Sequence, residues 1–509
     1  MIDSIKVRMY RHGFGDCFLL QYFNTDEKVC SMLIDCGIKW NDKVEGVSLK
    51  SVVNNIKTLL PKTTEGKPRL DFLIITHEHW DHVAGFDPKG GDLFEDIQID
   101  KIWLGWTENP KDPEAVQINK NLKDTITALG IANSMFTEKL QGDKESGHFD
   151  MLYKGEDIYK NRKNFIEQFN EVVNLYGPIQ MDNVTQSGIK FKDKYRISKS
   201  SERALNHVKK RIDAGKSSVE YFDPGEVILN DLLPGIRIYV LGPPKSRLLN
   251  KENPSSGQKK EVYYHPGMTA MAGFVNGVLS LNDDQFSNMD SGRPFEHYKK
   301  SIPEKEAKNR KFLNSTYFDP EEAWRNIDHD WLGISGALAL QMDNDTNNTS
   351  LAIAIEFIDS KKTLLFPGDA QVGSWLSWHD LTWTIQGKNG DSKDIKIQDI
   401  FRNTVLYKAS HHLSHNATLK ELGLEMMSHD ELVALIPEKQ DSYNGIPYKP
   451  LLDRLMDKAK GRVIFSADKN HPAEKILEKR PNSLSINEWK KFKSHLEIKK
   501  MFVEYTVKN

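Results

Sequence analysis

The sequence predicts an α/β protein whose core is interrupted by two large, partly helical insertions. Short apolar runs of strand length alternate with helical segments near the start of the chain and again after residue 343. Between these parts, two long stretches lack that alternation and are rich in charged residues. The 509 residues also exceed what one ordinary compact core holds, so several units or large insertions are expected.

The first part of the core is predicted to span residues 1–133. Short apolar runs bounded by turn residues indicate strands, and a longer run with a period of 3.6 residues indicates a helix. By these criteria, we expect strands at 5–9, 17–22, 32–35, 70–75 and 102–106, and a helix at 49–60. The strands before residue 36 should form hairpins.

The same patterns divide the rest of the chain. Residues 134–225 are predicted to form a helical insertion, because six apolar residues fall on one helical face: Phe165, Ile166, Phe169, Val172, Val173 and Tyr176. A core strand is expected within 226–244, and 245–342 is interpreted as a Lys-rich insertion or cap. The second part of the core, 343–475, should contain strands at 351–357, 363–366, 405–409, 432–436 and 463–467, followed by a C-terminal extension at 476–509.

The composition is that of a soluble globular protein, with 38% hydrophobic and 28% charged residues. No stretch approaches the roughly 18–20 apolar residues of a membrane helix, and the first residues lack an export signal, so we expect a cytoplasmic protein without a membrane partner. Cys17, Cys30 and Cys36 suit reduced, packed thiols better than a disulfide framework. The formal net charge of −2 neither indicates nor excludes a nucleic acid partner.

The segment Thr76-His77-Glu78-His79-Trp80-Asp81-His82 follows an apolar run and has the pattern of a metal site. In an extended turn, side chains two residues apart point the same way, so His77 and His79 can bind together. Asp81 and His82 can approach from the other side, and the cluster has enough ligands for two ions. Glu78 should face away. The alternative is a solvated polar loop after a strand.

Further ligands must come from later in the chain, because one short turn cannot surround two ions. Asp369 follows a predicted strand and Gly368, so its carboxylate should emerge at a strand end, where it could bridge two ions or act as a plain turn residue. His411 and His412 follow the next predicted strand. Adjacent residues of an extended segment face opposite ways, so one of the two histidines should be a ligand.

At this point the sequence resembles the metallo-β-lactamase fold hydrolases, whose HxHxDH signature is matched by residues 77–82. Other matches, in order, are Gly13-Phe14-Gly15-Asp16, Leu33-Ile34-Asp35-Cys36-Gly37, Asn347-Asn348-Thr349-Ser350-Leu351 before Pro367-Gly368-Asp369, residues 408–412, and His471-Pro472. They resemble the branch that contains the competence-type DNA-uptake nuclease domain and phosphorylcholine esterases. The matches span roughly half of the chain.

The resemblance implies an αββα sandwich with two divalent ions, Zn²⁺ or Mn²⁺, at the edge where its two sheets meet. It also implies a set of ligands by position: His77 and His79 for the first ion, Asp81 and His82 for the second, Asp369 as the bridge, and His412, rather than His411, in the last position.

Two positions depart from the family pattern. Asn347 stands where many relatives supply a third histidine to the first ion, which favours Mn²⁺ or a looser Zn²⁺ site. His148 or His265 from an insertion could substitute, or both could be plain surface residues. Leu413 stands where relatives usually carry glycine. This difference leaves open the path of the loop, and with it the choice between His411 and His412 as the ligand.

The expected mechanism is attack by a hydroxide that the two ions activate. Asp81 and Asp369 can orient this nucleophile while they bind metal. Lys408 is a candidate catalytic cation for a phosphodiester substrate, or else a solvent-facing strand residue. His471 is a candidate phosphate contact or leaving-group acid, or else a helix cap or turn residue.

Three functions are open. The first is a metal-dependent phosphodiesterase or nuclease, with a nucleic acid held by the Lys-rich insertion and by aromatic residues, which could equally be core: Trp103, Trp106, Tyr263, Tyr264 and Tyr298. The second is a small-molecule ester or phosphoester hydrolase with the insertions as a lid. The third is a partner-activated effector of a bacterial defence system, with the insertions as docking surfaces for proteins.

Overall fold

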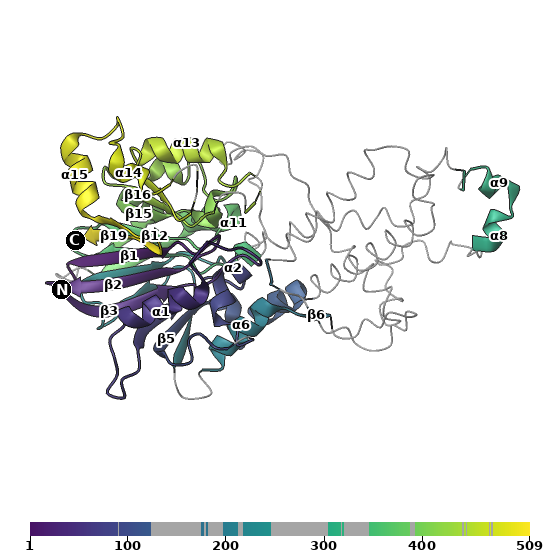
Figure 1. Ribbon diagram of the computed structural model, residues 1–509, viewed down its shortest axis with the longest axis horizontal. Coiled ribbons are helices and arrows are strands. Elements are labelled where there is room, and N and C mark those ends of the chain that lie inside the picture. The colour runs from purple at the N-terminus through teal and green to yellow at the C-terminus, as the bar shows by residue number, and fades with distance from the viewer. Residues whose placement is uncertain are drawn as a thin grey trace.

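The computed structural model describes residues 1–89, 91–123, 175–177, 180–181, 197–211, 217–245, 304–316, 318–319, 346–386, 392–439, 442–443, 445–467, 469 and 472–509. These residues form two large sheets with helices outside them (Figure 1). Within the described part of the chain, no helix is long and apolar enough to cross a membrane.

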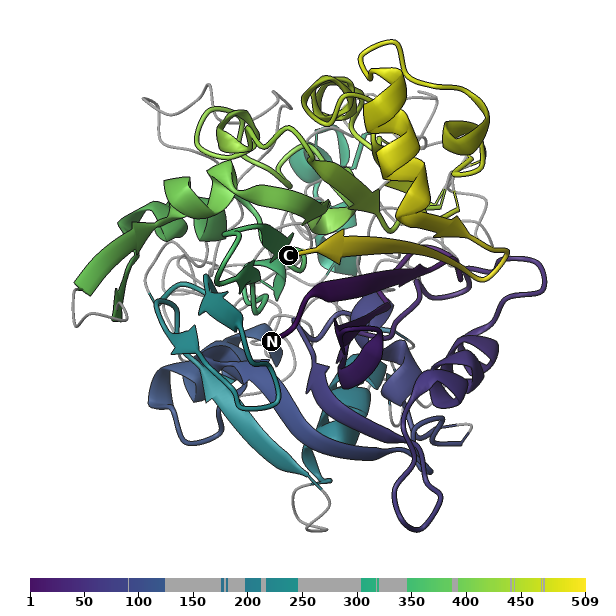
Figure 2. The same cartoon turned by 90° about the vertical axis from the view of Figure 1, so that its left-hand side faces the viewer.

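The first sheet has eight strands in the order β18-β19-β1-β2-β3-β4-β5-β8. Their bounds are β1 Ser4–Tyr10, β2 Phe18–Asn24, β3 Glu27–Ile34, β4 Arg69–Ile74, β5 Gln98–Gly105, β8 Ser218–Phe222, β18 Leu496–Ile498 and β19 Phe502–Lys508. β1, β2 and β3 pair antiparallel, as the predicted hairpins require, whereas β3, β4, β5 and β8 pair in parallel. The N- and C-terminal strands β1 and β19 lie side by side (Figure 2).

The second sheet has seven strands in the order β17-β16-β15-β12-β11-β10-β9. Their bounds are β9 Val227–Ile228, β10 Ile236–Val240, β11 Ile353–Phe357, β12 Thr363–Phe366, β15 Thr404–Lys408, β16 Val433–Ile436 and β17 Val463–Phe465. The last four of these in the chain, β12, β15, β16 and β17, pair in parallel. Every residue of β10, β11, β12, β15, β16 and β17 is buried, because layers cover both faces of this sheet.

Alternating side chains place three hydrophobic layers around the sheets. Ile5, Val7 and Met9 of β1 pack with Ile238 of β10 and Ile355 of β11, so the two sheets bury their inner faces against each other. The outer face of the first sheet packs against α1 (Leu49–Leu59), α2 (Trp80–Val83) and α6 (Ser200–Lys209). The outer face of the second packs against α11 (Val372–Ser377), α12 (Ile397–Arg402) and α13 (Lys449–Lys458).

The other described elements lie beside these layers or contribute a few residues to them, as α15 does through Phe492. They are β6 Gln180–Met181, β7 Ile197–Ser198, β13 Thr382–Gln386, β14 Ser392–Lys396, α8 Glu304–Lys308, α9 Lys311–Asn314, α14 Lys475–Glu478 and α15 Ile486–Ser494. In the described part of the chain, 3₁₀ helices span Ala84–Phe86, Trp106–Glu108, Trp378–Asp380, Ser410–Leu413 and Leu424–Met426.

Three strands of the first sheet, β8, β18 and β19, fall in ranges that the sequence did not assign to the core. β8 lies within 134–225 and pairs with β5, and β19 lies within 476–509 and pairs with β1. The sequence pattern did not predict β8 and β19, because β8 is half-exposed and β19 carries the charges of Glu504 and Lys508 among its apolar residues. Most of the two predicted insertions, including Phe165, Ile166, Phe169, Val172 and Val173 of the proposed helical face, lies outside the described residues.

The ends of four strands meet at one edge of the molecule. β3 and β4 are parallel in the first sheet, and β12 and β15 are parallel in the second, so the carboxyl ends of each pair lie together. A hydrogen bond from the Leu351 amide to the Thr76 carbonyl, 2.8 Å long, joins the segment before β11 to the segment after β4. The loops that follow these strands carry the predicted metal ligands, as expected for a site at the carboxyl ends of parallel strands.

Candidate metal centre

The loop after β4 is held by Asp35, which follows β3. The two Asp35 carboxylate oxygens accept hydrogen bonds from the Thr76 amide (2.8 Å) and the Thr76 hydroxyl (2.7 Å). His82 Nδ1 lies 2.8 Å from Asp35 Oδ2, so Nδ1–H donates to this carboxylate and Nε2 is left to face the opposite way. The loop also passes against Gly37, where a Cβ would lie 2.1 Å from the Asp81 carbonyl carbon. Only glycine allows this approach.

His77 and His79 turn their imidazoles toward each other. His77 Nε2 lies 3.1 Å from His79 Nδ1, while His77 Nδ1 faces the hydroxyls of Thr76 and Ser350 at 3.1 and 3.3 Å. Two donor atoms that bind one tetrahedral ion at about 2.0–2.1 Å lie about 3.3 Å apart, so this spacing fits a shared ion. Glu78 faces away, as predicted, and pairs with Lys199 at 2.8 Å.

Asp369 reaches the same place from the second sheet. After β12 the chain turns at Gly368, whose φ is 59°, and a Cβ there would lie 3.0 Å from Cβ of both Thr76 and Ser350. The Asp369 amide donates to the Ser350 hydroxyl at 3.1 Å, which fixes the start of the side chain. The carboxylate is 2% exposed and lies at the centre of the cluster.

His411 and His412 differ in direction because of a left-handed turn. φ is 42° at His411, 49° at His412 and 67° at Leu413, so the segment after β15 is not the extended one that we expected. His412 Nδ1–H donates to the Pro437 carbonyl at 2.6 Å, and Nε2 faces Asp81 and Asp369. Both ring nitrogens of His411 lie beside neutral side chains, Nε2 beside Asn347 (3.2 Å) and Nδ1 beside Ser414 (2.7 Å).

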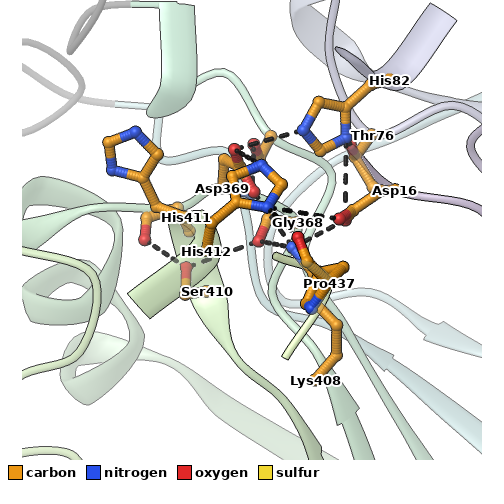
Figure 3. Close-up of polar contacts among 12 residues, drawn as sticks. Asp16, Thr76, His82, Gly368, Asp369, Lys408, Ser410, His411, His412 and Pro437 are labelled. Atoms are coloured by element: carbon orange, nitrogen blue, oxygen red, sulfur yellow. Dashed lines mark hydrogen bonds and ion pairs between the residues drawn. The ribbon is translucent and has the colours of Figure 1, made fainter. Parts of the chain in front are cut away.

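Figure 3 shows His82, His412 and Asp369 turned toward one another, with His411 directed away. His82 Nε2 lies 3.1 Å from Asp369 Oδ2, and His412 Nε2 lies 3.3 Å from the same oxygen and 3.2 Å from Asp81 Oδ2. Ligand atoms of Asp16, His82, Asp369 and His412 lie within 4.8 Å of one another.

The donor set of this cluster fits a divalent metal ion. Among the described residues, the buried atoms His82 Nε2 and Asp81 Oδ1 make no hydrogen bond, and His82 Nε2 lies beside the Asp369 carboxylate instead. Buried polar atoms are rarely left without a partner, and imidazole nitrogens with carboxylate oxygens are ligands of Zn²⁺ and Mn²⁺.

The buried carboxylates control the charge of His82 and His412, the two histidines that face the cluster. Burial alone would lower the pKa of His412, but Asp369, Asp81 and Asp16 raise it to about 10. Burial likewise opposes protonation of His82, and the Asp369, Asp16 and Asp35 carboxylates raise its pKa well above the ordinary value. Burial lowers the pKa of His79 to about 4, so His79 presents a neutral imidazole. Burial has the same effect on His411, whose pKa is lowered to about 4.

Lys408 is buried against the carboxylates of the site rather than at the surface. Its side chain is 1% exposed, and its ammonium lies 2.6 Å from Asp16 Oδ2 and 3.0 Å from Asp369 Oδ1. The solvent-facing alternative for Lys408 is therefore wrong. The other candidate catalytic residue, His471, lies outside the described residues, as do His148 and His265.

Sequence reasoning did not single out Asp16 or Asp35 as site residues. Both lie in motifs that the sequence displayed, Asp16 after Gly13-Phe14-Gly15 and Asp35 between Ile34 and Cys36, at the end of a strand. An aspartate at such a place in these two motifs is the signal from which both residues could have been predicted. Trp103 and Trp106, considered as stacking platforms for bases, are 0% and 1% exposed and belong to the core.

The fold and the cluster together define a class of protein: an α/β protein with two packed sheets and, at a shared edge, a buried Asp/His cluster that could hold a metal ion. More particularly, residues 10–88 match the family model of the metallo-beta-lactamase superfamily. This range contains Asp16 and residues 77–82, whereas Asp369 and His412 lie beyond it. Members of this superfamily are generally metal-dependent hydrolases, so the match supports that class of activity. A comparison with curated proteins gave no match.

Proposed function

We propose that this protein is a metal-dependent phosphodiesterase, with nucleic acid as its substrate and the four layers of its core forming the αββα sandwich of the metallo-β-lactamase fold. One observation carries the hydrolase assignment. His82, Asp369 and His412 come from two sheets and three loops, and their ligand atoms meet within a buried cluster beside Asp81. Imidazole nitrogens and carboxylate oxygens that meet in this way are the ligands that a divalent metal ion takes in proteins.

The proposed ligands divide into two groups that share Asp369. His77 and His79 would hold one divalent ion, and Asp81, His82 and His412 the other. These six proposed ligands include two carboxylates, and Asn347 rather than a third histidine stands in the position before β11, so the set is richer in oxygen than a closed nitrogen site, which favours Mn²⁺ over Zn²⁺. When bound, such a pair of ions lowers the pKa of a water molecule and polarises the substrate oxygen.

The residues of the chain prepare the reaction in two ways. Asp81 has a carboxylate oxygen, Oδ1, that makes no hydrogen bond to the described residues and can accept one from the attacking water. Asp35 and the Pro437 carbonyl hold Nδ1–H of His82 and His412, so neither ring can turn its Nε2 away from the cluster. These contacts position the ligands before substrate arrives.

The choice of a phosphodiester rests on the order of the sequence motifs and on the Lys-rich range 245–342. In the described part of that range, Lys308 and Lys311 lie exposed on α8 and α9. Exposed cations of this kind bind phosphate backbones. We propose that the two insertions contact nucleic acid, and that a protein partner, if activity requires one, docks there too.

The test is cleavage of labelled single- and double-stranded DNA and RNA by purified protein with Mn²⁺ or Zn²⁺. Bis(p-nitrophenyl) phosphate and p-nitrophenyl phosphate serve as small diester and monoester substrates. We expect Asp369→Ala to abolish cleavage, whereas Asp359→Ala, which changes an exposed carboxylate in the turn after β11, should cleave as the wild type does.

Each outcome has a defined meaning. Cleavage of a polymer that Asp369→Ala loses supports a metal nuclease. Cleavage of the small esters alone would replace the nucleic acid substrate with a small-molecule one. Wild-type cleavage by a folded Asp369→Ala variant would contradict the bridging role of this residue.

A further inference from the structure

Lys408 is enclosed by acceptors at the base of the cluster. It is the last residue of β15, and its ammonium donates to the Gly368 carbonyl at 2.9 Å and to Asp369 Oδ1 at 3.0 Å. Asp16 Oδ2 lies on its other side at 2.6 Å. An ammonium has three N–H donors, and these three oxygens account for all of them. Because the side chain is 1% exposed, it has neither a spare donor nor the access that contact with a substrate needs.

Asp16 is as firmly placed as Lys408. The Asp16 amide donates to the Asp81 carbonyl at 2.9 Å, and its carbonyl accepts from the Gly37 amide at 2.9 Å. The loop that carries Asp16 is thus tied to the loop that carries the predicted ligands, and the carboxylate is 1% exposed. The ammonium of Lys408 is therefore held between two buried carboxylates, those of Asp16 and Asp369.

The two Asp369 oxygens have different surroundings. Oδ1 accepts from Lys408, whereas Oδ2 lies 3.1 Å from His82 Nε2 and 3.3 Å from His412 Nε2. A carboxylate whose one oxygen is fixed by a buried cation cannot rotate to present both oxygens to the same ion. The direction of Oδ2 is therefore set by Lys408.

We propose that Lys408 is a positioning residue that orients the Asp369 carboxylate toward the metal centre, and that Asp16 acts by holding Lys408 rather than as a metal ligand. This inference rests on the proposed metal centre and deepens it, since it moves Lys408 from contact with substrate to support of a ligand. The alternative is that Asp16 itself binds metal, because its carboxylate belongs to the same buried cluster.

A double-mutant cycle of Lys408→Met and Asp16→Asn separates the two alternatives. Both replacements nearly keep the size of the side chain and remove one charge. The readouts are the number of Co²⁺ ions bound per chain, their affinity by competition with a chelator, and the visible absorption spectrum of Co²⁺, which reports ligand geometry. Wild type and Asp369→Ala are measured first. If the wild type binds no metal, the proposed function fails before Lys408 is tested.

We expect Lys408→Met to bind as many ions as the wild type, with affinity at least tenfold weaker and with an altered Co²⁺ spectrum, because removal of a group that orients a ligand typically costs tenfold or more. Asp16→Asn should change the spectrum in the same direction and, in the Lys408→Met background, should add little further loss.

Two results would overturn the inference. Loss of one bound ion by Asp16→Asn, in either background, would make Asp16 a ligand. An unchanged affinity and spectrum in Lys408→Met would remove the positioning role. Where Lys408→Met fails to fold, Asp16→Asn decides alone: all ions retained with an altered spectrum supports the inference, and one ion lost refutes it.

Discussion

At the scale of single residues, backbone conformation determines which of two adjacent histidines faces the cluster. Both follow β15 and both are mostly buried, yet His412 Nε2 points to Asp81 and Asp369 while His411 lies among Asn347 and Ser414. The left-handed turn that separates them costs about 1–2 kcal/mol for each residue without the freedom of glycine. Strain of this kind persists where the surrounding structure fixes it, and here it directs a predicted ligand.

His412→Ala should weaken metal binding far more than His411→Ala. Loss of His412 removes a ligand atom, and we expect one of the two proposed ions to be lost. His411→Ala removes a ring whose nitrogens already have neutral partners, so the full number of ions should remain. Metal content after gel filtration measures both variants, with His379→Ala, remote from the cluster, as a control. Equal loss in the two variants would show that His411 also binds metal.

At the scale of elements, α6 and the residues before it contact the loop that follows β4 and hold it in place. The Trp80 amide donates to the Leu175 carbonyl at 2.6 Å, and Lys199, at the start of α6, pairs with Glu78 at 2.8 Å. Arg203 binds Asp87 through two nitrogens at 2.7 and 2.8 Å. These contacts come from the range 134–225, so part of a segment predicted as an insertion supports the candidate site.

Lys199→Met should destabilise the protein by about 3 kcal/mol, because it leaves the buried Glu78 carboxylate without its cation. Denaturant unfolding measures the loss. The double variant Glu78→Gln with Lys199→Met should recover much of it, since no unpaired charge is then buried. Lys210→Met, which changes an exposed lysine at the end of the same helix, should cost less than about 0.5 kcal/mol. A similar loss in both lysine variants would mean that the pair contributes nothing specific.

The elements that the sequence predicted well are those with a strong local pattern. α1 was expected at 49–60 and spans Leu49–Leu59, and β12 was expected at 363–366 and spans Thr363–Phe366. β8 and β19 were not predicted, because half-exposed or charged strands acquire their place by pairing with β5 and β1, which are distant in sequence.

The candidate site shows the same division between local and tertiary information. The four predicted ligands in residues 77–82 could be proposed from spacing alone, and the side chains of His77, His79, Asp81 and His82 do lie together. The environment of Lys408 could not be predicted, because Asp16 is 392 positions earlier in the chain. Nothing in the local sequence around Lys408 indicates two buried carboxylates. The turn at His411 could not be predicted either, because tertiary contacts impose φ values there that the local sequence disfavours.

At the scale of the whole molecule, the candidate centre joins the two sheets. Asp81 and His82 follow β4 of the first sheet, Asp369 and His412 follow β12 and β15 of the second, and the C-terminal strand β19 pairs with β1 in the first sheet. A ligand that binds these residues together binds only the folded chain, because the unfolded chain cannot bring them into contact. Metal should therefore stabilise both halves of the core at once.

We accordingly expect the unfolding temperature to rise with the concentration of Mn²⁺ or Zn²⁺ and to fall on treatment with a chelator. At about one hundred times the dissociation constant, one site contributes about 2.7 kcal/mol to the free energy of unfolding. Asp369→Ala should abolish the dependence on metal while retaining a cooperative transition, and Asp359→Ala should keep the full dependence. Differential scanning calorimetry measures all three proteins. If the protein unfolded in two separate transitions and metal stabilised only one of them, the metal centre would belong to one sheet alone. The proposed role of Asp369 in joining the two sheets would then be wrong, because that role requires both sheets to lose the ion together.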